Sequence, residues 1–260
     1  MTNLMPAAFI GHGSPMNALE HNRYTDSWST FAATMPTPSA VLVVSAHWYV
    51  NITAVTAMKV PRTIHDFYGF PTELFEVQYP APGDPELAQR IVDVVEPTYV
   101  GLDEDSWGID HGTWSVLVHM FPQANVPVLQ LSINAQQPFD YHFNLGVKLH
   151  ELRSQGVFIL GSGNVVHNLR LIDWRQPGQG TDWAHRFDDG VRTIMTSDPS
   201  QLASSEDLGD YTLAVPTPDH FLPLAYLAGL SAAASSPTRT LVDGYEMGSL
   251  SMTAYELPGT

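Results

Sequence analysis

Three short apolar segments of this sequence are each followed by a histidine. His12 comes after residues 7–10, His47 after residues 41–45 and His167 after residues 157–160. With 11 histidines in 260 residues, coincidence explains this repetition poorly. A histidine near a strand end is often only a hydrogen-bonded loop residue, so each one alone carries little weight. As a set they indicate a metal site, because imidazole is a common ligand of Zn, Fe(II), Cu and Ni.

Two more histidines lie where a helix is expected to begin. His220 stands in VPTPDHFLPL, in which two prolines favour an extended approach and Asp219 could cap the following helix. His111 stands in GIDHGTW, after a turn. We predict that His12, His47 and His220 bind a metal ion. Three protein ligands would leave coordination positions open for water, substrate or dioxygen, so such a site would be catalytic. A further histidine could then act as general base and acid, worth about 10²–10⁴ in rate.

The segments that would position these histidines alternate between strand and helix patterns. Short apolar runs, typical of strands buried on both faces, cover residues 7–10, 41–45, 126–133 and 157–160, and a last strand is expected over 249–257. Helices are expected over residues 84–96 and 140–155, after His111, around 184–195 and after Asp219. This alternation predicts one α/β domain over residues 1–260, with three layers and a central mixed, largely parallel sheet flanked by helices. In such sheets ligands bind at the carboxyl ends of the strands.

The composition excludes several classes of protein. The chain has no cysteine, so a transition-metal site must use His, Asp or Glu. A formal charge of −16 repels a phosphate backbone, which argues against nucleic acid as a partner. The sequence contains no run of about 18 apolar residues, which a membrane-spanning helix would need. The N-terminal stretch MTNLMPAAFIGHG is a poor signal peptide. We therefore expect a cytoplasmic protein without a membrane partner, and the sequence does not predict its oligomeric state.

Residues 61–83, PRTIHDFYGFPTELFEVQYPAPG, interrupt the alternation of strands and helices. The segment is rich in proline and aromatic residues and follows neither a helical nor a strand period. Two interpretations stay open, a packed surface loop on the one hand and a lid or pocket wall on the other. His65 lies in this segment and fits either interpretation.

Six short motifs, in this order, resemble the class III extradiol ring-cleaving dioxygenases, in particular the DOPA 4,5-dioxygenase branch. They are HGSPM at 12–16, SAHW at 45–48, IHDFYGFP at 64–71, DHGTW at 110–114, GSGNVVHNL at 161–169 and PTPDHFLPL at 216–224. The resemblance continues to GSLSMT at 248–253 and so covers almost the whole chain. Each motif alone is modest, whereas six in order are specific.

The resemblance implies a role for each of the five histidines. His12, His47 and His220 would hold a non-haem metal ion, which is Fe(II) in the active enzyme, while Zn(II) can occupy the site on isolation. His167 would be the acid–base residue, close enough to act as a fourth ligand when zinc is bound. His111 would donate to the substrate or to bound oxygen.

One feature of the implied ligand set departs from the wider class. Familiar members use two histidines and a carboxylate, whereas the third position here is His220 with Asp219 beside it. We favour His220 as the ligand, because the DOPA branch shares this histidine.

The activity implied by the resemblance is the opening of a DOPA-like catechol ring by O2 next to the diol. His167 would help to deprotonate the catechol and, once protonated, would assist the later steps. His65, Phe67, Tyr68, Phe70 and Trp114 are candidates to flank the ring, although each aromatic residue would serve equally well in a core.

Three alternatives stay open. A zinc-dependent hydrolase built on the same histidines would work with Zn²⁺ and be indifferent to oxygen. A non-catalytic metal-binding protein would not need His167. A related enzyme could also act on another catechol, because substrate identity depends on pocket residues that the sequence does not place.

Overall fold

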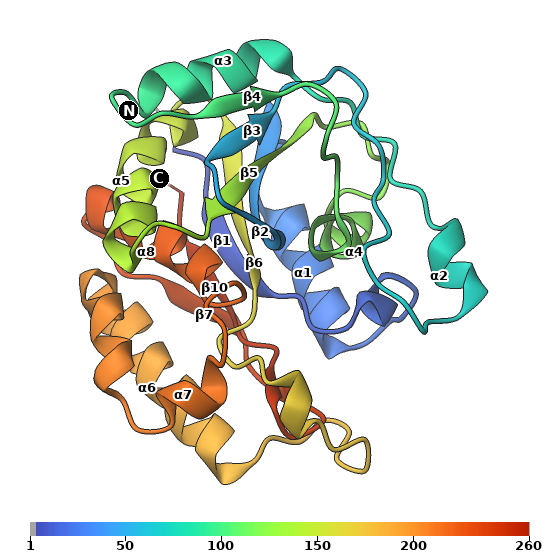
Figure 1. Ribbon diagram of the computed structural model, residues 1–260, viewed down its shortest axis with the longest axis vertical. Helices are drawn as coiled ribbons and strands as arrows, with labels where there is room; N and C mark the ends of the chain where they lie inside the picture. The colour runs from blue at the N-terminus through green and yellow to red at the C-terminus, as the bar shows by residue number, and fades with distance from the viewer. Residues whose placement is uncertain (1–3, 260) are drawn as a thin grey trace.

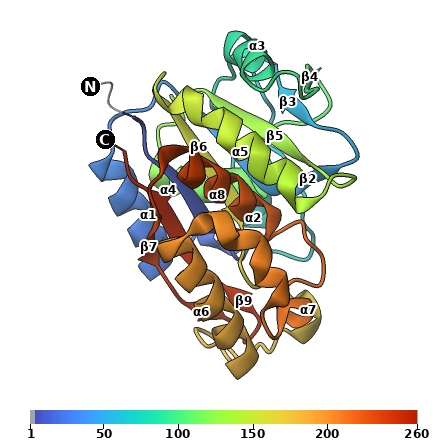
Figure 2. The same ribbon diagram turned by 90° about the vertical axis from the view of Figure 1, so that its left-hand side faces the viewer.

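A computed structural model describes residues 4–259, whose centre is a mixed eight-stranded sheet (Figures 1 and 2). In spatial order the strands are β4 (Gly101–Asp103), β3 (Ala54–Thr56), β5 (Val128–Asn134), β2 (Ala40–Val50), β6 (Val157–Gly163), β1 (Ala7–Gly11), β10 (Ala254–Leu257) and β7 (Arg239–Val242). Strands β8 (Tyr245–Glu246) and β9 (Leu250–Ser251) pair separately. The predicted α/β fold is confirmed. Residues 1–3 and 260 of the predicted domain lie outside the described residues.

The middle of the sheet is parallel. Strand β2 pairs in parallel with β5 and β6, and β6 pairs in parallel with β1. The flanks add antiparallel pairs, β3 with β5 on one side and β10 with β1 and β7 on the other. Every residue of β1, β5 and β6 is buried, which explains why these strands read as continuous apolar runs. Because β1, β2, β5 and β6 run the same way, their carboxyl ends meet at one edge.

Helices cover both faces of this sheet (Figures 1 and 2). The helices are α1 (Arg23–Thr34), α2 (Thr72–Glu76), α3 (Pro85–Val94), α4 (His111–Met120), α5 (Phe139–Arg153), α6 (Asp182–Ser197), α7 (Tyr211–Ala214) and α8 (Leu222–Ala234), with short 3-10 helices at Pro15–Ala18, Leu169–Leu171 and Pro199–Asp207. Helices α3, α5 and α8 pack on one face, and α1 and α4 lie on the other.

The two faces of the sheet build two separate cores. Along β1, Ala7 and Phe9 join the core beneath α5 and α8, whereas Ala8 and Ile10 join the core beneath α1 and α4. This alternation follows from the two-residue period of a strand. Helices packed on both faces therefore make the sheet rigid, and side chains at the carboxyl ends of its strands have fixed positions.

The predicted helices are confirmed, and aspartates cap two of them. Asp84 accepts a hydrogen bond from the Leu87 amide at the start of α3. Asp110 does the same for Thr113 at the start of α4. The predicted cap of α8 is wrong, because its N-cap is Phe221 and the Asp219 carboxylate instead contacts His220.

Two strand predictions need correction. Strand β2 runs on to Val50, so His47 lies inside the strand rather than after it. The pairing register with β5 shifts between Val44 and Tyr49, and such an irregularity re-aims the side chains within it. The predicted last strand over 249–257 is split into β9 and β10, because the Met252 amide turns aside to bond the Gly244 carbonyl.

No helix in the described part of the chain has the length and hydropathy needed to cross a membrane.

Candidate metal centre

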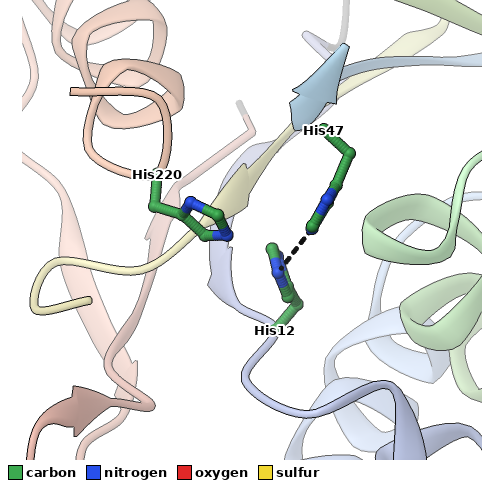
Figure 3. Close-up of side chains that lie close together, drawn as sticks. All are labelled: His12, His47 and His220. Carbon is green, nitrogen blue, oxygen red and sulfur yellow. Dashed lines mark hydrogen bonds between the residues drawn. The ribbon is translucent and has the colours of Figure 1, made fainter. Parts of the chain in front are cut away.

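His12, His47 and His220 converge at the carboxyl edge of the sheet. One ring nitrogen from each lies within 4.8 Å of the other two. The Nε2 atoms of His12 and His47 are 3.2 Å apart. In Figure 3 the Nε2 ends of these two rings point toward each other, and the ring of His220 is turned toward them from across the same space. His12 and His220 are buried and His47 is half-buried.

Three separate pieces of backbone bring these histidines together. His12 directly follows β1, and its amide donates to the Gly163 carbonyl at the end of β6. His47 lies in the irregular part of β2. His220 immediately precedes the turn into α8, and its carbonyl accepts from the Asn164 amide. This approach is so close that a Cβ on Gly163 would lie 2.1 Å from the His220 carbonyl oxygen, so only glycine fits there.

The Nδ1 atom of each of the three rings contacts a hydrogen-bond partner outside the cluster. His12 Nδ1 lies 3.0 Å from Ser162 Oγ, which itself donates to the Gly112 carbonyl and therefore accepts from His12. His47 Nδ1 lies 3.2 Å from Asp66 Oδ2. His220 Nδ1 lies 2.5 Å from Asp219 Oδ2.

These partners fix the proton of each ring on Nδ1 and leave the Nε2 lone pair free. Such outer partners are typical of metal-ligating histidines, because they set the tautomer and hold the ring in orientation.

The donor set fits a divalent transition metal. Two nitrogens bound to one tetrahedral ion at about 2.0–2.1 Å lie roughly 3.4 Å apart, close to the 3.2 Å between the Nε2 atoms of His12 and His47. Burial and the neighbouring histidines hold the pKa values of His12 and His220 well below the usual range, so both rings are neutral as ligands must be. Burial also opposes charge on His47, but Asp66 and Asp110 outweigh it and raise the pKa of His47.

A second group, His47, Asp66 and His111, lies beside the first. Asp66 Oδ1 accepts from His111 Nδ1 at 2.9 Å and from the His111 amide at 3.0 Å, while Oδ2 accepts from His47. These are hydrogen-bond distances, and His47 would have to bind metal through both nitrogens to make this a second metal site. Partial burial favours the neutral acid, but the hydrogen bonds from His111 and His47 prevail and hold the pKa of Asp66 below its usual range.

His167 stacks on the metal-site ring of His220. The ring centroids are 3.5 Å apart and the planes differ by 5°. Burial lowers the pKa of His167 to about 4, so the imidazole is neutral near pH 7 and can accept a proton. His111 has the same character, because burial and the neighbouring His47 lower its pKa despite the contact with Asp66. Two proton acceptors therefore stand beside the three candidate ligands.

Comparisons with known proteins agree with this site. Residues 6–255 match the family described as the catalytic LigB subunit of aromatic ring-opening dioxygenase. The chain belongs to the LigB family. The predicted resemblance to ring-cleaving dioxygenases is thereby confirmed, and it favours this class over a zinc hydrolase.

Individual relatives match along nearly the whole length of this LigB-family protein. A protein of Escherichia coli (strain K12) named 4,5-DOPA dioxygenase extradiol is 47 % identical, with 97 % of this chain and 94 % of the relative covered. A Beta vulgaris protein of the same name is 32 % identical, with 99 % and 98 % covered. The crystal structure of an uncharacterised protein of Escherichia coli K12 has a TM-score of 0.84 at 43 % identity, and covers 98 % of this chain and 100 % of that chain.

Segment 61–83 of the LigB-family protein reaches the site and is more than a surface loop. Besides Asp66, it brings the ring of Phe67 edge-on to His111, with centroids 5.4 Å apart. The ring of His65 is turned away, since its Nε2 donates to the Val77 carbonyl. Of the two interpretations of this segment, the structure favours a wall of the site.

The other aromatic residues predicted to flank a substrate lie differently. Trp114 is fully buried and its Nε1 donates to the Ile64 carbonyl, so it supports the segment from behind. Tyr68 is 91 % exposed. Phe70 packs edge-on against Phe67. A substrate contact for His65, Phe67, Tyr68 and Trp114 stays a prediction, and the structure places only Phe67 against the histidine cluster.

Sequence reasoning missed the residues that orient the histidines. Ser162 lies in the quoted GSGN stretch and Asp66 in IHDFYGFP, yet neither was predicted to contact the site. For Asp66 one signal was present, because it is the single carboxylate of the motif IHDFYGFP, whose other residues are mostly aromatic or apolar. From the sequence, Asp219 is only a neighbour of His220 and a possible helix cap.

Proposed function

We propose that this protein is an extradiol dioxygenase that opens the ring of a DOPA-like catechol with O2. The observation that carries the proposal is the set of three imidazoles, each with Nδ1 engaged outward and Nε2 free. This set occurs in a LigB-family chain, whose relatives named 4,5-DOPA dioxygenase extradiol match over almost its whole length. The partners we propose are a small catechol and O2, and the proposed location is the cytoplasm.

His12, His47 and His220 would hold the metal ion, which we propose is Fe(II) in the active enzyme. When bound, Fe(II) supplies Lewis acidity toward the catechol oxygens and a path for electrons from the ring to dioxygen. Imidazole sites generally bind Zn(II) more tightly than Fe(II), so we expect zinc in protein isolated without added iron.

His167 and His111 would move the protons of the reaction. A catechol carries two hydroxyl protons, and both imidazoles are neutral near pH 7 and able to accept one. The contact between His111 Nδ1 and Asp66 leaves Nε2 as its accepting atom. Once protonated, each imidazole can return its proton to a substrate oxygen as the catechol ring opens. In this proposal His167 is the principal base, and it remains a candidate fourth ligand when zinc is bound.

Activity after metal exchange tests the proposal directly. Metal-free protein is loaded anaerobically with Fe(II) or with Zn(II), mixed with L-DOPA and exposed to air, while oxygen uptake and visible absorbance are recorded. We expect oxygen uptake and a yellow product with Fe(II), and neither with Zn(II). No oxygen uptake with any catechol, from protein shown to hold iron, would overturn the proposal and favour the zinc hydrolase.

A further inference from the structure

Asp66 is the point at which segment 61–83 contacts the histidine cluster. Its two carboxylate oxygens bond to different rings, Oδ1 to His111 Nδ1 at 2.9 Å and Oδ2 to His47 Nδ1 at 3.2 Å. Oδ1 also accepts the His111 amide at 3.0 Å. One side chain thus contacts both a candidate metal ligand and a candidate proton acceptor.

The chemistry of a carboxylate suits this double contact. An ionised carboxylate only accepts hydrogen bonds, so both imidazoles must keep their protons on Nδ1. Their Nε2 lone pairs are then both free for the site. The rings of His47 and His111 are held close together, with centroids 3.9 Å apart. By accepting one hydrogen bond from each imidazole, the shared carboxylate lets both neighbouring rings keep a proton on Nδ1.

The other two ligands do not depend on segment 61–83. His12 Nδ1 is hydrogen-bonded to Ser162 of β6, and His220 Nδ1 is hydrogen-bonded to the adjacent Asp219. Only His47 among the three ligands takes its outer partner from that segment. The orientation of His47 therefore depends on how the segment is docked.

The segment is docked firmly just before Asp66. The Ile64 amide donates to the Ile109 carbonyl, and the Ile109 amide donates to the Arg62 carbonyl, each at 2.8 Å. The buried Trp114 ring donates to the Ile64 carbonyl at 2.8 Å. Ile109 and Trp114 flank His111 in sequence. The stretch that carries the His111 ring therefore also fixes the position of the Asp66 carboxylate that contacts this ring.

We propose that Asp66 is a positioning residue that sets the tautomer and orientation of both His47 and His111. Through His47 it strengthens metal binding, and through His111 it places a proton acceptor beside the catechol. The second effect rests on the proposed function, whereas the first does not.

The metal effect is tested with Asp66→Asn. An amide keeps the shape of the side chain but offers one acceptor and one donor, so it can satisfy only one of the two Nδ1–H groups. We expect Zn(II) affinity, measured by competition with a chromophoric chelator, to fall about 10–100-fold. Glu73→Gln is the matched control, because it removes a carboxylate from an exposed position of the same segment, and we expect unchanged affinity. An Asp66→Asn protein that binds Zn(II) as tightly as the wild type would overturn the proposal.

A measurement on the zinc-loaded wild type does not depend on how well the variant folds. Proton NMR of imidazole N–H groups should show slowly exchanging Nδ1–H signals from His47 and His111, both hydrogen-bonded to Asp66. In Asp66→Asn at least one of the two should be lost, while the signals of His12 and His220 persist. Wild-type protein in which His47 or His111 carries its proton on Nε2 would contradict the proposal.

The catalytic effect is tested by non-additivity. If Asp66 acts on turnover through His111, Asp66→Asn should reduce kcat/KM much less in a His111→Gln background than in the wild type, with Fe(II) saturating. Equal reductions in both backgrounds would overturn this part. The affinity and NMR measurements need no catechol. They therefore test the role of Asp66 at the metal site even if the proposed dioxygenase activity is not found.

Discussion

Each of the five site histidines is defined by what surrounds its ring. Ser162, Asp66 and Asp219 contact the Nδ1 atoms of His12, His47 and His220, and so direct three Nε2 atoms into one space. The ring of His167 is stacked face to face on His220. The histidines therefore divide into three with the geometry of ligands and two, His111 and His167, suited to proton transfer.

Replacing His167 should separate catalysis from metal binding. We expect His167→Gln to lower kcat about 10²–10⁴-fold, because a neutral amide cannot exchange a proton at this position. Fe(II) content after reconstitution should stay close to that of the wild type, since three ligands remain. The measurement is kcat from oxygen uptake alongside iron analysis. Loss of iron in parallel with loss of activity would instead make His167 a required ligand.

The sequence predicted the residues of the cluster better than their supports. From the sequence, His12 and His47 are expected to meet because strand ends converge at one edge of a parallel sheet, and His220 is expected to join them from the start of a helix; the structure brings the three together. Asp66 could not be placed, because segment 61–83 has no period and its position depends on contacts with residues 109–114. The local sequence can mark this carboxylate as unusual, but it does not show where the segment docks.

Among the elements, α4 and β2 press closely on one another at the site. A Cβ on Gly112 would lie 2.6 Å from His47 Cδ2 and 2.8 Å from Ser45 Oγ. Gly112 is the second residue of α4, so the first turn of that helix sets how far the ring of His47 can move. The expectation that His47 follows its strand missed this arrangement, since the register shift in β2 depends on its pairing with β5.

Enlarging Gly112 should therefore damage the site without unfolding the protein. Alanine is a better helix former than glycine, which offsets part of the strain. We expect Gly112→Ala to displace His47 and to weaken Zn(II) binding about tenfold or more, with little change in Tm. Gly209→Ala is the control, because no atom lies within 4 Å of the added Cβ. Equal Zn(II) affinity in the two variants would contradict this account of His47.

A buried carboxylate joins α6 to the C-terminal strands. Asp188 accepts hydrogen bonds from Ser251 Oγ at 2.6 Å, Thr253 Oγ1 at 2.8 Å and Tyr245 OH at 3.2 Å. Burial raises the pKa of Asp188 above its ordinary value of 3.8, and the three hydroxyl groups only partly oppose this. Burying the charged form therefore costs stability at neutral pH.

The sign of the pH dependence follows from that raised pKa. The folded state holds the Asp188 proton more tightly than the unfolded state, so the stabilisation is complete below about pH 4 and is lost as pH rises through the folded pKa. We expect the free energy of unfolding of the wild type, relative to Asp188→Asn, to fall as pH rises from about 4. The fall should be about 1.4 kcal/mol for each unit by which the pKa is raised. Denaturant titrations of both proteins across this range measure it, and a relative stability that rises with pH would contradict the burial argument.

At the scale of the whole molecule, the excess of acidic residues creates a negative field. The formal charge is −16, and two of the acidic residues behind it, Asp66 and Asp219, lie at the site itself. Charged substrates feel such a field over about a Debye length, roughly 8–10 Å at physiological salt. The field should favour catechols with a cationic side chain.

Salt dependence tests this electrostatic preference. With Fe(II)-loaded enzyme, kcat/KM for dopamine, a cation, should fall as the NaCl concentration is raised. The value of kcat/KM for 3,4-dihydroxybenzoate, an anion, should rise, because salt screens its repulsion. Both substrates are compared at one pH, with oxygen uptake as the readout. The opposite order of salt effects would show that local contacts outweigh the overall charge.

In the function we propose, His12, His47 and His220 hold an iron ion at which a catechol ring is opened by dioxygen. The most direct measurement is mass spectrometry of the product formed by Fe(II)-loaded protein from L-DOPA under isotopically labelled dioxygen. We predict a ring-opened product that carries both labelled oxygen atoms, and no such product from His12→Ala. A product that carries only one labelled atom, or a quinone that carries none, would contradict extradiol cleavage at this site.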